Sequence, residues 1–279
     1  MSELIWHRRP ELDHPIVIAA FEGWNDAGDA ASAAVRHLID VWQAELFASI
    51  DPEEFFDFTT HRPTVRLIAE DRREIDWPEN SFWSASAPGA GDIVLLMGTE
   101  PSLRWRTFCE QVLEVVGVTG ARLIVTVGAL LADVPHSRPA SAFGTAYDPA
   151  VIDEFNLERS TYQGPTGIVG VLHHACTVAG VRSASLWAAV PSYVAEVPSP
   201  KAQHALVERI GKMLGTPIPL EDLQARADVY TREISDLVAE DDDTVAYVRH
   251  LEDAHDRDRE ATGGLDELVA ELEKYLREQ

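Results

Sequence analysis

Cysteine is scarce in this sequence, since only Cys109 and Cys176 occur in 279 residues. Each lies in a segment with a helix-like pattern, which fits two reduced, buried thiols and argues against a disulfide framework. Neither has a second cysteine or a histidine at the spacing of a zinc site. We therefore expect no metal site, and nothing in the sequence calls for a cofactor.

Basic residues and long apolar runs are also lacking. The chain has 23 lysines and arginines against 47 acidic residues, which gives a formal net charge of −24. A surface of that sign repels phosphate backbones and anionic lipid heads, so we expect neither nucleic acid nor a membrane as a partner. No uninterrupted apolar run approaches the roughly 18 residues that suggest a membrane span. No basic segment leads into an apolar core at the amino terminus, so we expect a cytoplasmic protein.

The residues that are present have ordinary globular composition, 46% hydrophobic and 25% charged. Apolar, strand-like runs alternate with helical patterns, which predicts an α/β fold. The expected strands are 16–21, 46–50, 65–69, 93–97, 123–127 and 185–190, and the expected helices are 25–42, 102–116, 166–178 and 200–214. Residues 65–75 read as a hairpin that turns at 70–73, and 82–85 adds another short strand. These additions predict a mixed sheet.

The composition changes after Pro217 and Pro219, where the chain becomes helical and acidic. We expect an α/β domain over residues 1–219 and an acidic helical extension over 220–279. The extension contains helical segments at 221–239 and 244–255 and a final amphipathic helix after Gly263 and Gly264. Its apolar stripes need cover, so it either packs back on the body, which is the simpler reading, or forms a partner surface.

The loop after the first long strand carries Glu22, Asn25 and Asp26 together. Loops at the carboxyl ends of strands form the ligand crevice of open α/β sheets. Two carboxylates in one partly desolvated loop can act as an acid and base pair, because their pKa values are pushed apart. The competing interpretation is structural, in which Asn25 or Asp26 caps the following helix and Glu22 is solvated. The two carboxylates disfavour phosphate here and favour a cation, an amine or the Arg138 side chain.

A second polar cluster lies in the segment Gly128 to Pro139, read as a loop, which brings His136 and Arg138 to the edge where Glu22 lies. One interpretation is that the cluster binds a polar ligand together with Glu100 of a neighbouring loop. The other is that it forms a salt-bridge network that holds the loops in place, and this second interpretation is favoured. If the site is catalytic, the candidates are Glu22, Asp26 and His136. No strand-linked Gly-x-Ser-x-Gly elbow surrounds Ser141, so a serine nucleophile is not expected.

Motifs along much of the chain resemble those of the PAC2 family, the proteins related to proteasome assembly chaperone 2. The motifs are residues 21–30, 57–58 with 62–63, 98–101 with Trp105, 128–131 with 136–139, 162–167, and 186–193 with 198–202. They occur in order over about residues 16–250, and the chain resembles the actinobacterial branch of the family.

The resemblance implies a three-layer α/β/α fold with a mixed sheet, similar to purine nucleoside phosphorylases and related hydrolases, with added carboxyl-terminal helices. It also implies protein partners, including further copies of the chain, possible trimers among them, and a link to the proteasome. Some relatives dock through a terminal hydrophobic-Tyr-any tripeptide, whereas this sequence ends in Arg277, Glu278 and Gln279. That difference argues against docking by the tail.

The sequence therefore favours a non-catalytic chaperone-like or scaffold protein that acts through protein contacts and self-association. The alternative is a small-molecule binder or a hydrolase-like or phosphorylase-like enzyme, for a nucleoside-like or amine ligand, that uses the acidic loop after the first strand. The first hypothesis rests on the resemblance, and the second rests on the residues of the loops.

Overall fold

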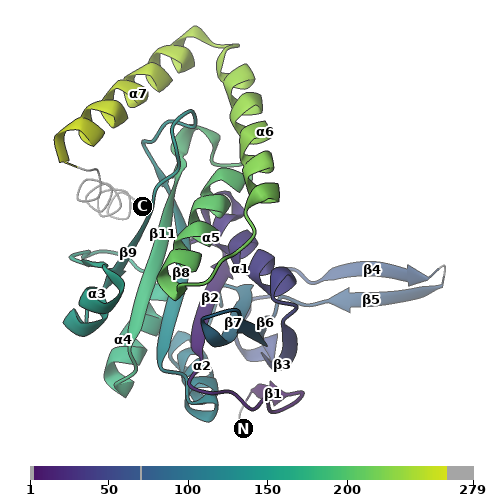
Figure 1. The fold of residues 1–279 in the computed structure, drawn as a ribbon. Coiled ribbons are helices and arrows are strands. Elements are labelled where there is room, and N and C mark those ends of the chain that lie inside the picture. Colours follow the sequence, from purple (N-terminus) through teal and green to yellow (C-terminus); the bar gives the residue numbers. More distant parts are fainter. Residues whose placement is uncertain (1–2, 70, 263–279) are drawn as a thin grey trace.

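A computed structural model describes residues 3–69 and 71–262, which form a nine-stranded sheet covered by helices. The strands follow the spatial order β1-β3-β6-β7-β2-β8-β11-β9-β10. Their bounds are β1 Leu4–Trp6, β2 Ile16–Glu22, β3 Glu45–Ile50, β6 Asn80–Ala87, β7 Gly91–Thr99, β8 Leu123–Ala132, β9 Ala142–Ala146, β10 Glu158–Arg159 and β11 Ser183–Pro191. The predicted mixed α/β sheet is therefore confirmed (Figure 1).

The centre of the sheet is parallel, and the strands on either side of it run antiparallel to it, with β10 parallel to its neighbour β9. Strands β7, β2, β8 and β11 run in the same direction. Strands β6 and β9 run against their neighbours β7 and β11. The parallel strands are apolar almost throughout because both of their faces are covered, which is why the sequence shows them as continuous runs.

Helices cover both faces of the sheet, which confirms the three-layer architecture. Helices α1 (Ala30–Val41) and α5 (Pro200–Leu214) share a core with Ile16 and Ile18 of β2. Helices α2 (Trp105–Thr119) and α4 (Ile168–Ala179) share the other core with Val17 and Ala19. Neighbouring residues of a strand point to opposite faces, so these two cores lie on opposite sides of the sheet.

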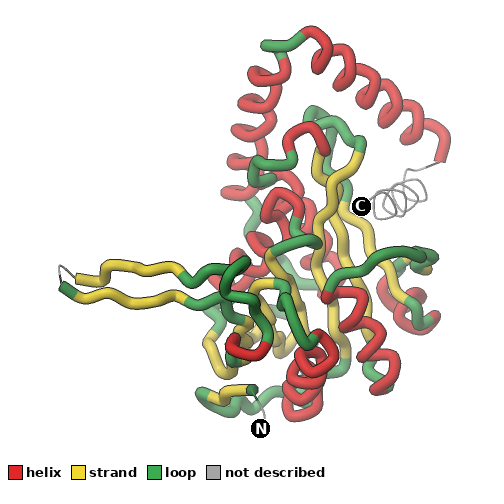
Figure 2. The backbone as a smooth tube through the Cα atoms, turned by 180° about the vertical axis from the view of Figure 1, so that it is seen from behind, coloured by secondary structure: helices red, strands yellow, loops and turns green. Residues whose placement is uncertain are grey.

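Two features project from this body (Figures 1 and 2). Strands β4 (Thr64–Ala69) and β5 (Arg72–Asp76) form a separate two-stranded sheet, as the sequence predicted. Helices α6 (Glu221–Val238) and α7 (Asp242–Thr262) make an arch beside the far ends of β8 and β11. The arch has a small core of its own, in which Tyr230 and Ile234 pack against Val194.

The predicted helix 102–116 begins too early. The helix begins at Trp105 after Arg104, whose φ is +53° and which makes no side-chain cap bond. The Ser102 hydroxyl lies instead 3.1 Å from Nδ1 of His61. Ser102 therefore lies within hydrogen-bond distance of a residue in a distant loop and is not part of the helix.

The predicted strand 123–127 is too short, because β8 continues to Ala132. Pairing with β11 extends from Ile124 to Ala132 and keeps Gly128 to Ala132 in the sheet. Four elements were not predicted: β1, β9, β10 and the short helix α3 (Pro149–Phe155). Three of these lie between residues 142 and 159.

The carboxyl-terminal helices pack partly on the body, since Leu223 of α6 belongs to the core that α1 and α5 share. The division of the chain at residue 219 stays a prediction. The expected final amphipathic helix after Gly264 lies outside the described residues. Within the described residues, no helix combines the length and the apolar character that crossing a membrane requires.

Candidate functional site

Glu22 ends β2 and is already paired with a cation. Its Oε1 forms an ion pair with Arg36 of α1, and its Oε2 accepts a hydrogen bond from Thr99 Oγ1 at 3.3 Å. Both members of the ion pair are almost half exposed. The carboxylate is thus not simply solvated, because its ion pair ties the end of β2 to the helix that follows.

Asp26 caps the helix, as the structural interpretation predicted. Its Oδ1 accepts hydrogen bonds from the backbone N–H groups of Ala31 at 2.7 Å and Ser32 at 3.1 Å. The capping carboxylate lies several residues ahead of α1, because the short 3₁₀ helix Ala27–Asp29 intervenes. Oδ2 is buried without a partner among the described residues, and burial raises the pKa of the Asp26 carboxyl.

We expect Asp26→Ala to lower the unfolding free energy at pH 7 by about 2 kcal/mol, because it leaves two helix-start N–H groups unpaired. Asp26→Asn keeps one acceptor oxygen and removes a buried charge, so it should change the unfolding free energy by less than about 1 kcal/mol. Urea unfolding of the wild type and both variants measures the difference. If Asn costs as much as Ala, the charge itself is required and the capping account fails.

Glu100 lies at the start of α4, where free backbone N–H groups favour an anion. Glu100 Oε1 accepts a hydrogen bond from the N–H of Ile168 at 2.8 Å. The glycine at position 167 allows this approach, since a Cβ there would lie 2.6 Å from Glu100 Oε1 and 2.5 Å from Asn25 Oδ1. A carboxylate of the protein itself therefore takes the place of an external anion.

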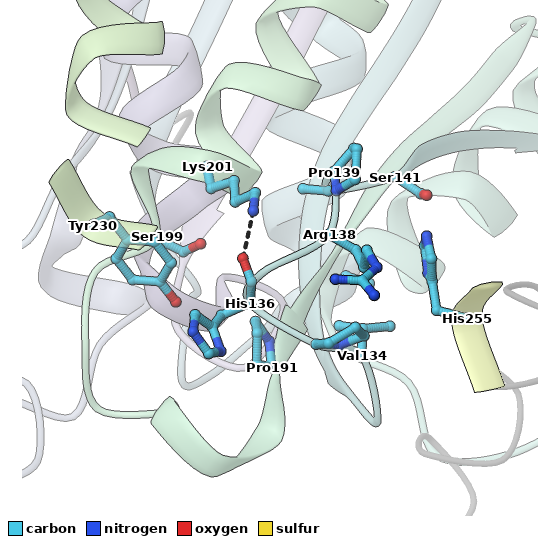
Figure 3. A pocket seen from close by; sticks show the side chains of 13 residues that line it. Val134, His136, Arg138, Pro139, Ser141, Pro191, Ser199, Lys201, Tyr230 and His255 are labelled. Carbon is cyan, nitrogen blue, oxygen red and sulfur yellow. Dashed lines mark hydrogen bonds between the residues drawn. The ribbon is translucent and has the colours of Figure 1, made fainter. Parts of the chain in front are cut away.

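His136 is buried at the centre of a network between the β8–β9 loop and α6. Its backbone N–H donates to Tyr193 Oη at 2.7 Å, and its ring Nδ1 lies 2.7 Å from the same oxygen. Its Nε2 lies 2.9 Å from Ser235 Oγ, and Lys201 Nζ donates to its carbonyl oxygen (Figure 3). Burial, together with the Lys201 charge, lowers the pKa of the imidazole, so the ring is neutral near pH 7.

Arg138 joins the same loop to α7. Its guanidinium donates through Nε and Nη2 to Asp256 at 2.8 and 2.6 Å, and Nη1 lies 3.3 Å from Glu252 Oε1. The Ser137 hydroxyl also donates to Glu252. Figure 3 shows that the cavity beside His136 and Arg138 is also lined by Tyr230 and His255 of the helical arch. The cavity measures about 40 Å³, space for roughly three water molecules.

The expected meeting of Arg138 with the acidic loop does not occur. Glu22 is paired with Arg36, and Arg138 is paired with α7. The reason is the length of β8, which continues five residues beyond Val127, the residue that pairs with Ala20 of β2. Glu22 lies two residues beyond Ala20, so β8 extends three residues further than β2. Three extended residues span roughly 10 Å, which carries the loop with His136 and Arg138 past the edge where Glu22 lies.

The candidate residues thus belong to separate networks, and their expected catalytic and ligand-binding roles stay predictions. The sequence missed the partners Arg36, Tyr193, Ser235 and Glu252. Arg36 had a local signal, because it lies on the helix that directly follows the acidic loop. Ser235 and Glu252 had none, because their contacts with residues 136–138 depend on how α6 and α7 fold back.

The fold and these networks define a class: a three-layer α/β protein whose polar strand-end loops are tied together by internal hydrogen bonds and ion pairs. A model of the PAC2 family matches residues 20–238. The chain belongs to the PAC2 family, which confirms the resemblance seen in the sequence.

Two solved actinobacterial structures are each 45% identical to this chain. A PAC2 family protein from Streptomyces avermitilis has a TM-score of 0.78, and the match covers 84% of this chain and 99% of that chain. A proteasome-assembly chaperone homologue from Mycobacterium tuberculosis has a TM-score of 0.76 with the same coverage. An archaeal proteasome activator from Pyrococcus furiosus, at 19% identity, TM-score 0.69 and 85% and 99% coverage, shows the fold alone. No curated protein matches this chain.

Proposed function

We propose that this protein is a non-catalytic, chaperone-like scaffold that acts through protein contacts, beginning with self-association through the β4–β5 hairpin. The family relationship supports a role in protein assembly, since a relative at 45% identity is a proteasome-assembly chaperone homologue. The observation that carries the proposal is the uncovered apolar face of the hairpin. The hairpin extends away from the body, as both views of the backbone show (Figures 1 and 2).

The two faces of the hairpin differ in chemistry. Val65 pairs with Ile75 across the strands, and Leu67 lies two residues from Val65, so the three side chains share one face. They are 56%, 49% and 66% exposed. On the other face Arg66 forms ion pairs with Glu74 and Asp76. A two-stranded hairpin is marginally stable alone in water, so an uncovered apolar face of this kind favours a partner that buries it.

The charge distribution favours a second copy of the chain as that partner. Residues 62–77 contain four arginines and four acidic residues, so the whole formal net charge of −24 lies elsewhere. Two copies repel one another over most of their surfaces. The hairpin carries no net formal charge, so two copies can meet there with less repulsion, through the face that holds Val65, Leu67 and Ile75 together with Arg73, which pairs with Leu67. The contact would be self-complementary, as in an isologous dimer interface.

The test combines Val65→Ser, Leu67→Ser and Ile75→Ser in one variant. We expect light scattering coupled to size exclusion to show an oligomer for the wild type and the 30.8 kDa chain for the variant. The far-UV circular dichroism spectrum should be unchanged, because these side chains are exposed in the single chain and the variant keeps its fold.

The control variant combines Val178→Ser and Leu237→Ser, which remove exposed apolar side chains from α4 and α6. It should keep the mass of the wild type. A wild type that is monomeric at 30.8 kDa, or a hairpin variant that keeps the wild-type mass, would contradict the proposal.

The alternative, a binder or enzyme for a nucleoside-like or amine ligand at the acidic loop, has less support. Glu22 and Asp26 each already accept hydrogen bonds or an ion pair from the protein. His136 lies in a different network, beyond the end of β2.

A further inference from the structure

A cavity of about 70 Å³ lies on the α4 side of the sheet, away from the networks of His136 and Arg138. Its walls come from α4, from β9 and β11, from residues 160–166, and from the loop after β2. Four aromatic rings line it, those of Trp24, Tyr147, Tyr162 and Trp187. Trp24 and Tyr147 are 38% and 51% exposed, so the cavity opens to solvent beside them.

The lining carries no formal charge. None of the fourteen described residues around the cavity is Asp, Glu, Lys or Arg, although a quarter of the chain is charged. His173 is the one titratable side chain besides the tyrosines, and its burial lowers its pKa to about 4. A charged ligand would lose its hydration here with no opposite charge to replace it. The cavity therefore suits an uncharged molecule.

Two buried polar atoms of lining residues have no hydrogen-bond partner among the described residues. They are Oδ1 of Asn25, a residue only 6% exposed, and Nδ1 of His173, also 6% exposed. Such atoms are costly to leave unpaired, and at a cavity they mark where a ligand can bind. The carboxamide oxygen of Asn25 is an acceptor, so the complementary group is an N–H or O–H donor.

The backbone of Asn25 is fixed, and its amide oxygen lies beside Gly167, the residue that follows Thr166 of the lining. The backbone carbonyl of Asn25 accepts the N–H of Ala129 at 2.8 Å, which fixes the residue against β8. A Cβ at Gly167 would lie 2.5 Å from Asn25 Oδ1 and 3.0 Å from the Trp24 ring. Any side chain at position 167 would crowd the amide oxygen, and glycine avoids this.

We propose that this cavity is a binding site for a small, uncharged heteroaromatic molecule that stacks on the aromatic rings and donates an N–H to Asn25. The molecule would extend from the cavity toward the exposed Trp24 and Tyr147, where the cavity opens to solvent. This inference does not depend on the proposed scaffold function or on the β4–β5 hairpin, so either can fail without the other.

The test uses three probes of similar shape on the full chain, with titration calorimetry as the readout. Indole has the ring N–H, benzothiophene lacks it, and indole-3-carboxylate adds a negative charge. We expect indole to bind with a dissociation constant below about 1 mM, as a ligand of its size can. Benzothiophene should bind about fivefold more weakly, because it has no ring N–H to donate to Asn25. The carboxylate should bind more weakly still.

Three variants connect the binding to the residues. Asn25→Leu should make indole and benzothiophene bind equally, and the melting temperature should not fall, because the change removes an unpaired buried oxygen. Trp24→Ala should weaken indole at least fivefold through lost stacking. The matched control is Trp77→Ala, which removes a similarly exposed tryptophan outside the cavity and should leave the indole affinity unchanged.

Four outcomes would overturn the proposal: no binding of indole at several millimolar, equal binding of indole and benzothiophene to the wild type, tighter binding of the carboxylate, or equal weakening by Trp24→Ala and Trp77→Ala. Retained preference for indole in a folded Asn25→Leu variant would also overturn the role of the amide.

Discussion

Replacing Gly98 with alanine should lower the unfolding free energy by about 3 kcal/mol, at the upper end of overpacking costs. Gly98 lies in β7 directly opposite Asn80 of β6. A Cβ at this position would lie 2.3 Å from the backbone oxygen of Glu79 and 2.2 Å from Oδ1 of Asn80. The Glu79 contact is with backbone, so it cannot be relieved by a change of rotamer. Either β6 separates from β7 or the strand distorts.

The control for Gly98→Ala is Gly117→Ala, in which the same methyl group is added to α2. A Cβ at Gly117 meets nothing within 4 Å. Alanine has the higher helix propensity by about 1 kcal/mol, so this variant should be more stable than the wild type. Urea unfolding of both variants measures the two changes. If Gly98→Ala is as stable as the wild type, the register of β6 against β7 described above is wrong.

Acidification from pH 7 to pH 4 should cost the protein about 3 kcal/mol through His173 alone. The ring is buried in α4, with Nε2 2.6 Å from Ser185 Oγ and 2.9 Å from Thr126 Oγ1. Burial lowers its pKa from 6.5 to about 4. Between these two values the unfolded chain binds a proton that the native chain does not. Stability contributed by the neutral ring is thus full above pH 6.5 and is lost as the pH falls toward 4.

The variant that isolates this effect is His173→Gln, compared with the wild type by urea unfolding at both pH values. Between pH 7 and pH 4, the unfolding free energy of the variant should fall by about 3 kcal/mol less than that of the wild type. His174→Gln, at the neighbouring exposed position on the same helix, is the control and should leave the acid-induced loss in place. An equal acid-induced loss in His173→Gln and the wild type would contradict the assignment.

The central strands could be predicted because burial on both faces leaves a direct trace in the sequence. Strands β2, β7 and β11 contain long apolar runs, and the prediction found them. Strand β9 has no such run, since its sequence is Ala-Phe-Gly-Thr-Ala. It becomes a strand by pairing with β11, and Gly144 lets the Leu157 and Leu186 side chains approach it closely. That stabilisation is nonlocal, so the sequence pattern did not show it.

In the candidate site, too, contacts between residues close in sequence could be predicted, and contacts between distant residues could not. The capping role of Asp26 could be predicted because its partners, Ala31 and Ser32, lie within the next turns of chain. The pairing of Arg138 with Glu252 and Asp256 could not, because it joins residues more than 100 positions apart. The cavity beside Asn25 and His173 was also not predicted, since its walls come from five separate segments of the chain.

The sequence by itself determined the layer architecture, the scarcity of positive charge, the hairpin over residues 65–75 and the membership of the PAC2 family. These properties follow from the order of apolar and charged residues along the chain, or from local motifs. The tertiary structure decided which charges meet and which polar atoms remain unpaired. The length of β8 and the way α7 folds back toward the β8–β9 loop decide which side chains come close together. Hydrogen bonds form only between groups about 3 Å apart, so these positions decide the partners.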